Sequence, residues 1–272
     1  MDPPVYDTLI LSDVHLGSEV SRAEDATQLL RQTQFRRLIL LGDIFSDLNF
    51  RRLTKAHWRF LGYIRKLSNP KRRVEVVWVE GNHDRGLVDI MSHLVGVRVY
   101  QEYVWEYQGL RHLAIHGHQF DRFVVNNSLI SAANSFVHLQ IQRFDFTGKW
   151  FSRFVDRMGT RWLRLSSKVA SGAMAHARLR QAGRVFCGHT HVALSRRDDD
   201  EIEYYNSGSW ADSRGTYITI DAEGVRIHEY DGQQRSDDRD SGEERGQADP
   251  QPAEFADEAG LSADAEYENI GG

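Results

Sequence analysis

The stretch VVWVEGNHDRG, Val76 to Gly86, joins a run of apolar strand formers to a cluster of polar side chains. The valines and the tryptophan favour a buried β-strand. Gly and Asn tolerate left-handed backbone, so the cluster by itself is typical of an ordinary turn after a strand. Whether Asn82, His83 and Asp84 do more than make a turn depends on the rest of the chain.

Four other short apolar runs also end in polar clusters, namely TLILSDVH (8–15), RLILLGDIFSD (37–47), HLAIHGH (112–118) and RVFCGHTH (184–191). Helical patterns lie between some of them. One is SRAEDATQLLRQ (21–32), in which Ser21 and Glu24 have the spacing of a capping box, and another is TKAHWRFLGYIRKL (54–67). This alternation predicts an α/β fold with a largely parallel sheet, in which the five clusters converge at the carboxyl ends of the strands.

The chain after Gly188 has a different pattern. EIEYYNSGSW, RGTYITI and GVRIHEY alternate apolar and polar residues, and DAEG (221–224) has the composition of a hairpin turn. We expect antiparallel strands here, in a second sheet layer packed on the first.

The polar clusters hold residue types that bind metals. Three pairs are spaced two apart: Asp13 and His15, His116 and His118, and His189 and His191. If strand geometry continues through them, each pair lies on one face and can hold one ion. Asp43 and Asn82 end the two remaining strands. A lone Asp after a strand is usually a helix cap and a lone His is usually structural, but seven such groups at strand ends predict two ions.

The donor types indicate which metals fit. Carboxylate, imidazole and amide oxygen without thiolate suit manganese, iron, zinc or magnesium. The predicted ligands are Asp13, His15, Asp43, Asn82, His116, His189 and His191.

The motifs DVH, GD, GNHD, HGH and GHTH, in this order, resemble those of the calcineurin-like metallophosphoesterases. The resemblance implies a four-layer α/β sandwich of two mixed sheets flanked by helices. It also implies two divalent ions, with Mn²⁺ expected and Fe, Zn or Mg as alternatives, and Asp43 bridging them. One site is completed by Asp13, His15 and His191, and the other by Asn82, His116 and His189.

The same resemblance gives the GNHD cluster a catalytic role. His83 points past the metals towards the substrate and stabilises charge or protonates the leaving oxygen. Asp84 is expected to hold His83 in its useful tautomer. Two divalent ions bind phosphate oxygens and activate a water for in-line attack on phosphorus.

Within this superfamily the chain is most similar to bacterial UDP-2,3-diacylglucosamine hydrolases of lipid A synthesis. The similar features are HGHQFDRF, a long helical insertion before GHTH, and YYNSGSWADS after it. Those enzymes cleave a pyrophosphate and release UMP and an acylated glucosamine 1-phosphate. The chain departs from them at His83 and His118, where the best-known members have Arg and Asp, and GDIFSDLNF lacks their acidic-Trp continuation. The alternatives are a metallophosphoesterase for a cyclic nucleotide, a phosphoprotein or another lipid phosphate, and a noncatalytic scaffold of the same fold.

The insertion, residues 120–180, is rich in aromatic residues and carries ten Lys or Arg against three Asp. Basic, aromatic helices commonly lie on anionic membranes. We expect a helical cap whose apolar interior holds acyl chains, with Arg164 and Lys168 facing the diphosphate or sugar. His118 and Asp121 are further candidate substrate residues.

Composition and charge set the remaining expectations. The net charge of −5 divides into +5 for residues 1–230 and −10 for the Pro-, Gly- and Ser-containing remainder. This division predicts one ordered domain over 1–231 and a disordered acidic tail over 232–272. The motif resemblance implies that the ordered domain is a metallophosphoesterase domain. A body charge of +5 does not favour nucleic acid as a partner. Neither a membrane-span-length apolar run nor a leader is evident, and a single cysteine fits a reducing compartment, so we expect a cytoplasmic protein. Because the expected substrate is a lipid, we also expect the protein to associate peripherally with the inner face of the inner membrane.

Overall fold

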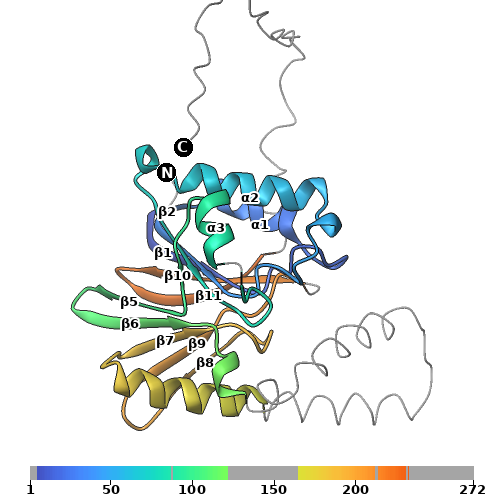
Figure 1. Cartoon of the computed structure of the whole chain (residues 1–272). Coiled ribbons are helices and arrows are strands. Elements are labelled where there is room, and N and C mark those ends of the chain that lie inside the picture. Colours follow the sequence, from blue (N-terminus) through green and yellow to red (C-terminus); the bar gives the residue numbers. More distant parts are fainter. Residues whose placement is uncertain (1–4, 87, 122–164, 212–213, 231, 233–272) are drawn as a thin grey trace, which may run out of the picture. The chain divides into compact units, whose positions relative to one another are not determined.

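The computed structural model describes residues 5–86, 88–121, 165–211, 214–230 and 232. These residues form four layers, which Figure 1 shows from top to bottom: three helices, a six-stranded sheet, a five-stranded sheet, and a helix over residues 165–179. The predicted class, a mixed α/β sandwich with two sheets and flanking helices, is confirmed.

The first sheet has the order β11-β10-β1-β2-β3-β4. Its strands are β1 (Val5–Leu11), β2 (Gln34–Leu41), β3 (Glu75–Val79), β4 (Val99–Tyr100), β10 (Gly215–Asp221) and β11 (Gly224–Tyr230). The four strands β1 to β4 are parallel, and β10 pairs antiparallel with β1. The outer helices are α1 (Ala23–Gln32), α2 (Lys55–Leu67) and α3 (Val88–Leu94).

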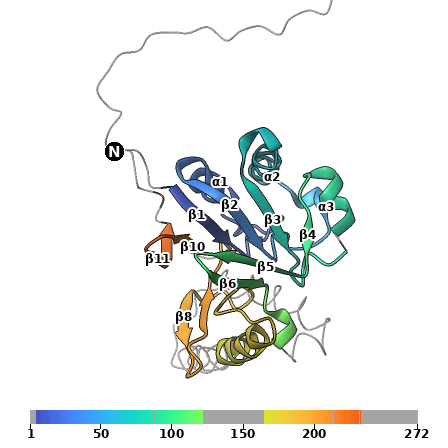
Figure 2. The same cartoon turned by 90° about the vertical axis from the view of Figure 1, so that its left-hand side faces the viewer.

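The second sheet has the order β5-β6-β7-β9-β8. Its strands are β5 (Glu102–Tyr107), β6 (Leu110–Ile115), β7 (Arg184–Cys187), β8 (Leu194–Arg197) and β9 (Glu203–Asn206). The strands β6, β7 and β9 are parallel, and β5 and β8 run antiparallel at the two edges. Figure 2 shows the two sheets face to face, with the helix over 165–179 beneath the second.

Strand periodicity explains why both faces of β1 to β3 are apolar. Leu9 and Leu11 face α1 and α2, whereas Ile10, between them, packs with Trp105 and Phe186 of the other sheet. The core is therefore continuous from the outer helices to the second sheet.

Two expectations about the sheets are wrong. The strands β6 and β7, which carry the HGH and GHTH motifs, lie in the second sheet instead of extending the first. The strands β10 and β11 join the first sheet, on the free edge of β1, instead of building a second layer. Period-2 alternation identifies a strand with one buried face, but it does not identify the neighbour of that strand. The DAEG turn does join β10 to β11, as predicted.

The capping box at the start of α1 is also absent. Arg22 occupies the N-cap position without a side-chain cap, and the Ser21 hydroxyl donates to the carbonyl of Val14 at 2.6 Å. The predicted helix over 54–67 is confirmed, with Thr54 as its N-cap and a capping box closed by His57.

The end of the predicted cap insertion is part of the core. In the helix over 165–179, Ala170, Ala173 and Met174 are buried and pack with residues of β6 and β7. The apolar side of this helix is thus occupied by the sheet, and acyl chains cannot also lie there. Residues 122–164, which include Arg164, and the acidic tail from 233 onward lie outside the described residues. Within the described part of the chain, no helix is long and apolar enough to cross a membrane.

Candidate metal centre

Six of the seven predicted ligands form two clusters at the strand ends. Asp13, His15 and His191 make one cluster, and Asp43, His116 and His189 make the other, with the ligand atoms of each cluster within 4.8 Å of one another. These clusters have the membership that the motif resemblance implies. We expected each pair of residues spaced two apart to hold one ion, and only Asp13 and His15 share a cluster. His189 and His191 belong to different clusters, and His118, the partner of His116, belongs to neither.

The backbone explains why strand periodicity fails here. Each of these strands ends before its ligands, and five ligand residues have positive φ, between 50° and 68°: Asp13, His15, Asp43, His189 and His191. Left-handed backbone is uncommon outside glycine and is typically retained where the surroundings enforce it, often at functional sites. The side chains converge because of this turn geometry.

The cluster around Asp13 brings one carboxylate oxygen and two imidazole nitrogens close together. Asp13 Oδ1 lies 3.2 Å from His191 Nε2 and 3.8 Å from His15 Nε2, and the two imidazole nitrogens are 3.2 Å apart. The other oxygen of Asp13 accepts from the backbone N–H of His189 at 3.1 Å, which orients the carboxylate.

The cluster around Asp43 is oriented in a similar way. Asp43 Oδ1 accepts from the backbone N–H of His83 at 2.9 Å, and Oδ2 lies 3.3 Å from His116 Nε2. His116 donates its Nδ1 proton to the carbonyl of Leu41 at 2.8 Å. Because that carbonyl holds the Nδ1 proton, Nε2 faces the cluster as the ligand atom.

Three buried atoms of the site have no hydrogen-bond partner among the described residues: Asp13 Oδ1, Asn82 Oδ1 and His116 Nε2. Buried polar atoms are nearly always satisfied, and leaving one unsatisfied costs about 1–3 kcal/mol. All three are of the donor types that divalent cations bind. The residues present therefore fit bound metal ions.

Protonation of the cluster follows from its charges. Burial raises the pKa of Asp43, but the neighbouring His116 outweighs it, and the pKa lies well below the usual carboxylate value. Burial and then His191 lower the pKa of His15 to about 4. Burial also lowers the pKa of His116, yet Asp43 beside it raises the value to about 10. The carboxylates are thus ionised and His15 is neutral, and a cation entering the second cluster displaces a proton from His116.

His83 lies beside Asp43, but Asp84 does not orient it. The Nδ1–H of His83 donates to the carbonyl of Ser46 at 2.7 Å, and its Nε2 lies 4.0 Å from Asp43 Oδ2. The carboxylate of Asp84 instead accepts from the backbone N–H groups of Ile44 and Phe45 at 3.1 and 2.9 Å. The expectation that Asp84 sets the tautomer of His83 is therefore wrong; Asp84 holds the loop that carries Asp43.

The candidate substrate residues have different positions. His118 is buried, and its ring lies 5.6 Å from that of His116. Burial lowers the pKa of His118 to about 3, so it is neutral. Asp121 Oδ2 lies 3.4 Å from His189 Nε2, which places it against a predicted ligand. Lys168 is exposed on the helix over 165–179.

The NSGSW segment braces the ligand loops, a role that the sequence did not reveal. The side-chain amide of Asn206 donates to the carbonyl of Gly188 at 2.7 Å. The backbone N–H of Trp210 and the hydroxyl of Ser209 donate to the carbonyl of Asp13 at 3.0 and 3.3 Å. The run of small polar residues after a strand was the available signal.

Two motif glycines lie so close to ligand carboxylates that a side chain at either position would not fit. A Cβ on Gly188 would lie 2.4 Å from Asp13 Oδ2, and one on Gly81 would lie 2.2 Å from Asp43 Oδ1. Any other residue at either position would displace a carboxylate.

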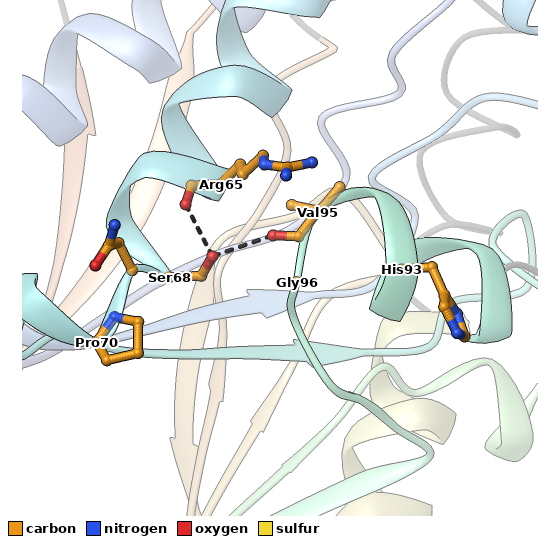
Figure 3. A pocket seen from close by; sticks show the side chains of 7 residues that line it. Arg65, Ser68, Pro70, His93, Val95 and Gly96 are labelled. Atoms are coloured by element: carbon orange, nitrogen blue, oxygen red, sulfur yellow. Dashed lines mark hydrogen bonds between the residues drawn. The ribbon is translucent and has the colours of Figure 1, made fainter. Parts of the chain in front are cut away.

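An open pocket lies elsewhere, at the C-terminal end of α2. Figure 3 shows Arg65, Ser68 and His93 among its lining residues, with Ser68 bonded to the carbonyls of Arg65 and Val95. None of the predicted metal ligands lines this pocket.

Two clusters of oxygen and nitrogen ligands at the strand ends of a double-sheet α/β sandwich define a candidate dinuclear metalloprotein. The family model for calcineurin-like phosphoesterases matches residues 6–193. The chain belongs to the calcineurin-like phosphoesterase family. No curated protein matches it.

Several solved structures are similar to the chain. An archaeal phosphodiesterase has 14% identity over 82% of this chain and 98% of its own, with a TM-score of 0.44. Vps29 of Cryptosporidium parvum has 13% identity over 82% and 96%, with a TM-score of 0.43. Vps29 of Entamoeba histolytica, in a structure with zinc, has 14% identity over 82% and 97%, with a TM-score of 0.38.

Proposed function

We propose that the chain is a dinuclear metal-dependent hydrolase that cleaves the pyrophosphate of UDP-2,3-diacylglucosamine to UMP and an acylated glucosamine 1-phosphate. The observation that carries the hydrolase part is the pair of clusters with orphaned, buried ligand atoms on Asp13, Asn82 and His116. The acylated substrate is supported by HGHQFDRF, the insertion and the NSGSW segment.

The residues divide between the two ions as follows. Asp43 lies where it can serve both, Asp13, His15 and His191 hold one, and Asn82, His116 and His189 hold the other. We propose manganese because the donors are oxygen and imidazole without thiolate. When bound, the pair supplies Lewis acidity towards phosphate oxygens and lowers the pKa of water.

His83 is the residue proposed to act on the leaving group. The carbonyl of Ser46 fixes its Nδ1–H, so Nε2 is the atom that faces the reacting ester. A proton carried on Nε2 can pass to the departing oxygen, or its positive charge can stabilise that oxygen as the bond breaks. The buried His118 and Asp121 shape the side of the site next to His116 and His189.

The direct test is incubation of the manganese-loaded protein with UDP-2,3-diacylglucosamine and measurement of UMP. We expect UMP to form with the parent protein and not with Asp43→Ala. If the parent releases no UMP but hydrolyses a chromogenic phosphodiester, the substrate assignment fails and the phosphoesterase assignment stands.

One observation favours a second candidate. His83 and His118 stand where the best-known acyl-UDP-sugar hydrolases have Arg and Asp, and a histidine after GN is typical of general phosphodiesterases. The second candidate is therefore hydrolysis of another phosphodiester or phosphomonoester, such as a cyclic nucleotide, a phosphoprotein or another lipid phosphate. A noncatalytic scaffold would bind metal and hydrolyse neither substrate.

A further inference from the structure

The outer side of α2 carries a concentrated positive charge far from the insertion in sequence. From Lys55 to Arg73 the chain has seven basic residues and neither Asp nor Glu. All seven are exposed: Lys55, Arg59, Arg65, Lys66, Lys71, Arg72 and Arg73. We call these residues, together with Trp58, the α2 basic face.

Helical geometry places the α2 members on one stripe. At about 100° per residue, Lys55, Trp58, Arg59, Arg65 and Lys66 lie within an arc of about 120°. Phe60, Leu61 and Ile64 point into the core instead. The 3-10 helix η2 (Pro70–Arg72) continues the charge beyond the helix end. Figures 1 and 2 both show α2 on the outside of the six-stranded sheet.

The charge of this face is little neutralised. Arg59 lies 3.7 Å from Glu24. For Lys55, Lys66, Lys71, Arg72 and Arg73, no ion pair is present within the part of the chain that the structure describes. The guanidinium of Arg31, from α1, lies over the ring of Tyr63 on α2 and adds to the same region.

Exposed apolar groups accompany the charge. Trp58 is 51% exposed between Lys55 and Arg59 on the stripe, and Leu48 is 51% exposed in the loop that leads to α2. Gly62, also on the stripe, has open space where a side chain would be. An aromatic ring among basic side chains suits a bilayer interface, where the ring enters the headgroup region and the cations meet anionic lipids.

The α2 basic face begins beside the metal clusters. Gly17, two residues after His15, donates its backbone N–H to His57 Nδ1 in the first turn of α2 at 3.2 Å. The loop that precedes α2 holds His83 through the carbonyl of Ser46. A surface bound along α2 thus reaches the rim of the candidate active site.

We propose that the α2 basic face docks the protein on anionic lipid bilayers. The role of this docking in substrate delivery rests on the proposed acylated substrate, but binding to lipid does not. Seven cations and an exposed tryptophan complement an anionic bilayer in charge and in polarity, whereas a nucleic acid duplex, whose bases are stacked on one another, would complement the charge alone.

The test is co-sedimentation of the full chain, without substrate, with vesicles of phosphatidylcholine that contain or lack phosphatidylglycerol. We expect binding to the anionic vesicles alone, weakening as salt rises. Lys66→Gln/Lys71→Gln/Arg72→Gln should weaken binding roughly a hundredfold, at about fivefold for each cation. The matched control, Arg111→Gln/Arg196→Gln/Arg214→Gln, removes the same charge from exposed positions outside α2 and η2 and should bind like the parent.

A second measurement tests the tryptophan. Brominated phosphatidylcholine in anionic vesicles should quench part of the fluorescence of the parent, and this part should disappear in Trp58→Phe. Equal weakening by the two triple variants, or quenching unchanged in Trp58→Phe, overturns the proposal. So does salt-sensitive binding to a duplex oligonucleotide with no binding to anionic vesicles.

Assays of hydrolysis distinguish a failure of the docking proposal from a failure of the proposed function. The α2 triple variant should hydrolyse a chromogenic phosphodiester like the parent, which also shows that it folds. If the parent binds anionic vesicles through α2 but releases no UMP from the acylated substrate, the substrate assignment fails and the docking surface stands. If it releases UMP at equal rates from detergent and from anionic vesicles and does not sediment with the vesicles, the docking surface fails alone.

Discussion

Asp43 is the residue that we propose serves both ions. Its Oδ1 accepts from the backbone N–H of His83 at 2.9 Å, and its Oδ2 lies 3.3 Å from His116 Nε2 in the second cluster. Asp43→Ala should abolish binding of both metals and lower kcat on the order of a thousandfold or more, because several kcal/mol of transition-state stabilisation are lost. Metal content and turnover are measured on the same sample. Two retained metals with near-normal turnover would refute the bridging role.

His83 is expected to behave differently. Its Nδ1–H donates to the carbonyl of Ser46, and the residue belongs to neither cluster. His83→Ala should therefore keep its metals while kcat on a chromogenic phosphodiester falls by roughly 10² to 10⁴. Loss of metal in this variant would identify His83 as a ligand.

Gly188 tests whether close packing sets the ligand geometry. The methyl group in Gly188→Ala would lie 2.4 Å from Asp13 Oδ2, which forces the carboxylate away from His191. We expect weaker metal binding in this variant. Gly62→Ala is the matched control, since its methyl group meets open space within α2, and the helix gains up to about 1 kcal/mol. Metal binding that is equal in both variants would contradict the expected displacement.

At the scale of the elements, the inner face of the second sheet carries a buried histidine in an aromatic stack. The ring of His112, on β6, lies 5.0 Å from that of Trp105 on β5 and 5.8 Å from that of Phe186 on β7. Burial lowers the pKa of His112 to about 4, whereas an unfolded histidine titrates near 6.5. The stack thus holds a neutral imidazole.

This stack predicts a pH dependence of stability. The depressed pKa contributes stability that is fully present above pH 6.5 and is lost as pH falls towards 4, with an upper limit of about 3 kcal/mol. Denaturant unfolding at several pH values measures it. His112→Phe keeps an aromatic ring without a titrating group, and its stability should fall less between pH 6.5 and 4 than that of the parent. If the free energy of unfolding of the parent and of His112→Phe changes equally between pH 6.5 and 4, His112 does not titrate in this range.

The elements also show what the sequence could predict. The five runs that end in polar clusters became β1, β2, β3, β6 and β7, because branched and apolar residues in strand-length runs report burial directly. The pairing of β10 with β1 was missed because it joins residues far apart in the chain, such as Thr8 and Ile220, which local periodicity does not encode. The left-handed backbone at Asp13 and His191 was missed because neither residue requires it. The candidate metal ligands were still identifiable, because Asp, Asn and His are residue types that bind metals whatever their backbone conformation.

At the scale of the whole molecule, we expect metal binding to raise the free energy of unfolding. The ligands come from both sheets and are brought together only in the folded chain, so a cation binds the native state in preference to the unfolded one. Added Mn²⁺ should raise Tm, by the equivalent of about 2.7 kcal/mol at a concentration of 100 times Kd, and a chelator should reverse the shift. Thermal unfolding with and without chelator measures this effect. The Asp43→Ala variant should show no shift, and a parent protein indifferent to Mn²⁺ would contradict the assignment of the site.

The position of β10 has a consequence for synthesis on the ribosome. Strand β1 is made before every other strand of the sheet, but β10, the partner for its free edge, is made only after the GHTH motif has emerged. Until then β1 offers unpaired backbone groups that can recruit other nascent chains. His15 and His191, 176 positions apart, likewise meet only after the GHTH motif has been made. A chain that terminates before His191 therefore carries an open sheet edge without a complete set of candidate metal ligands.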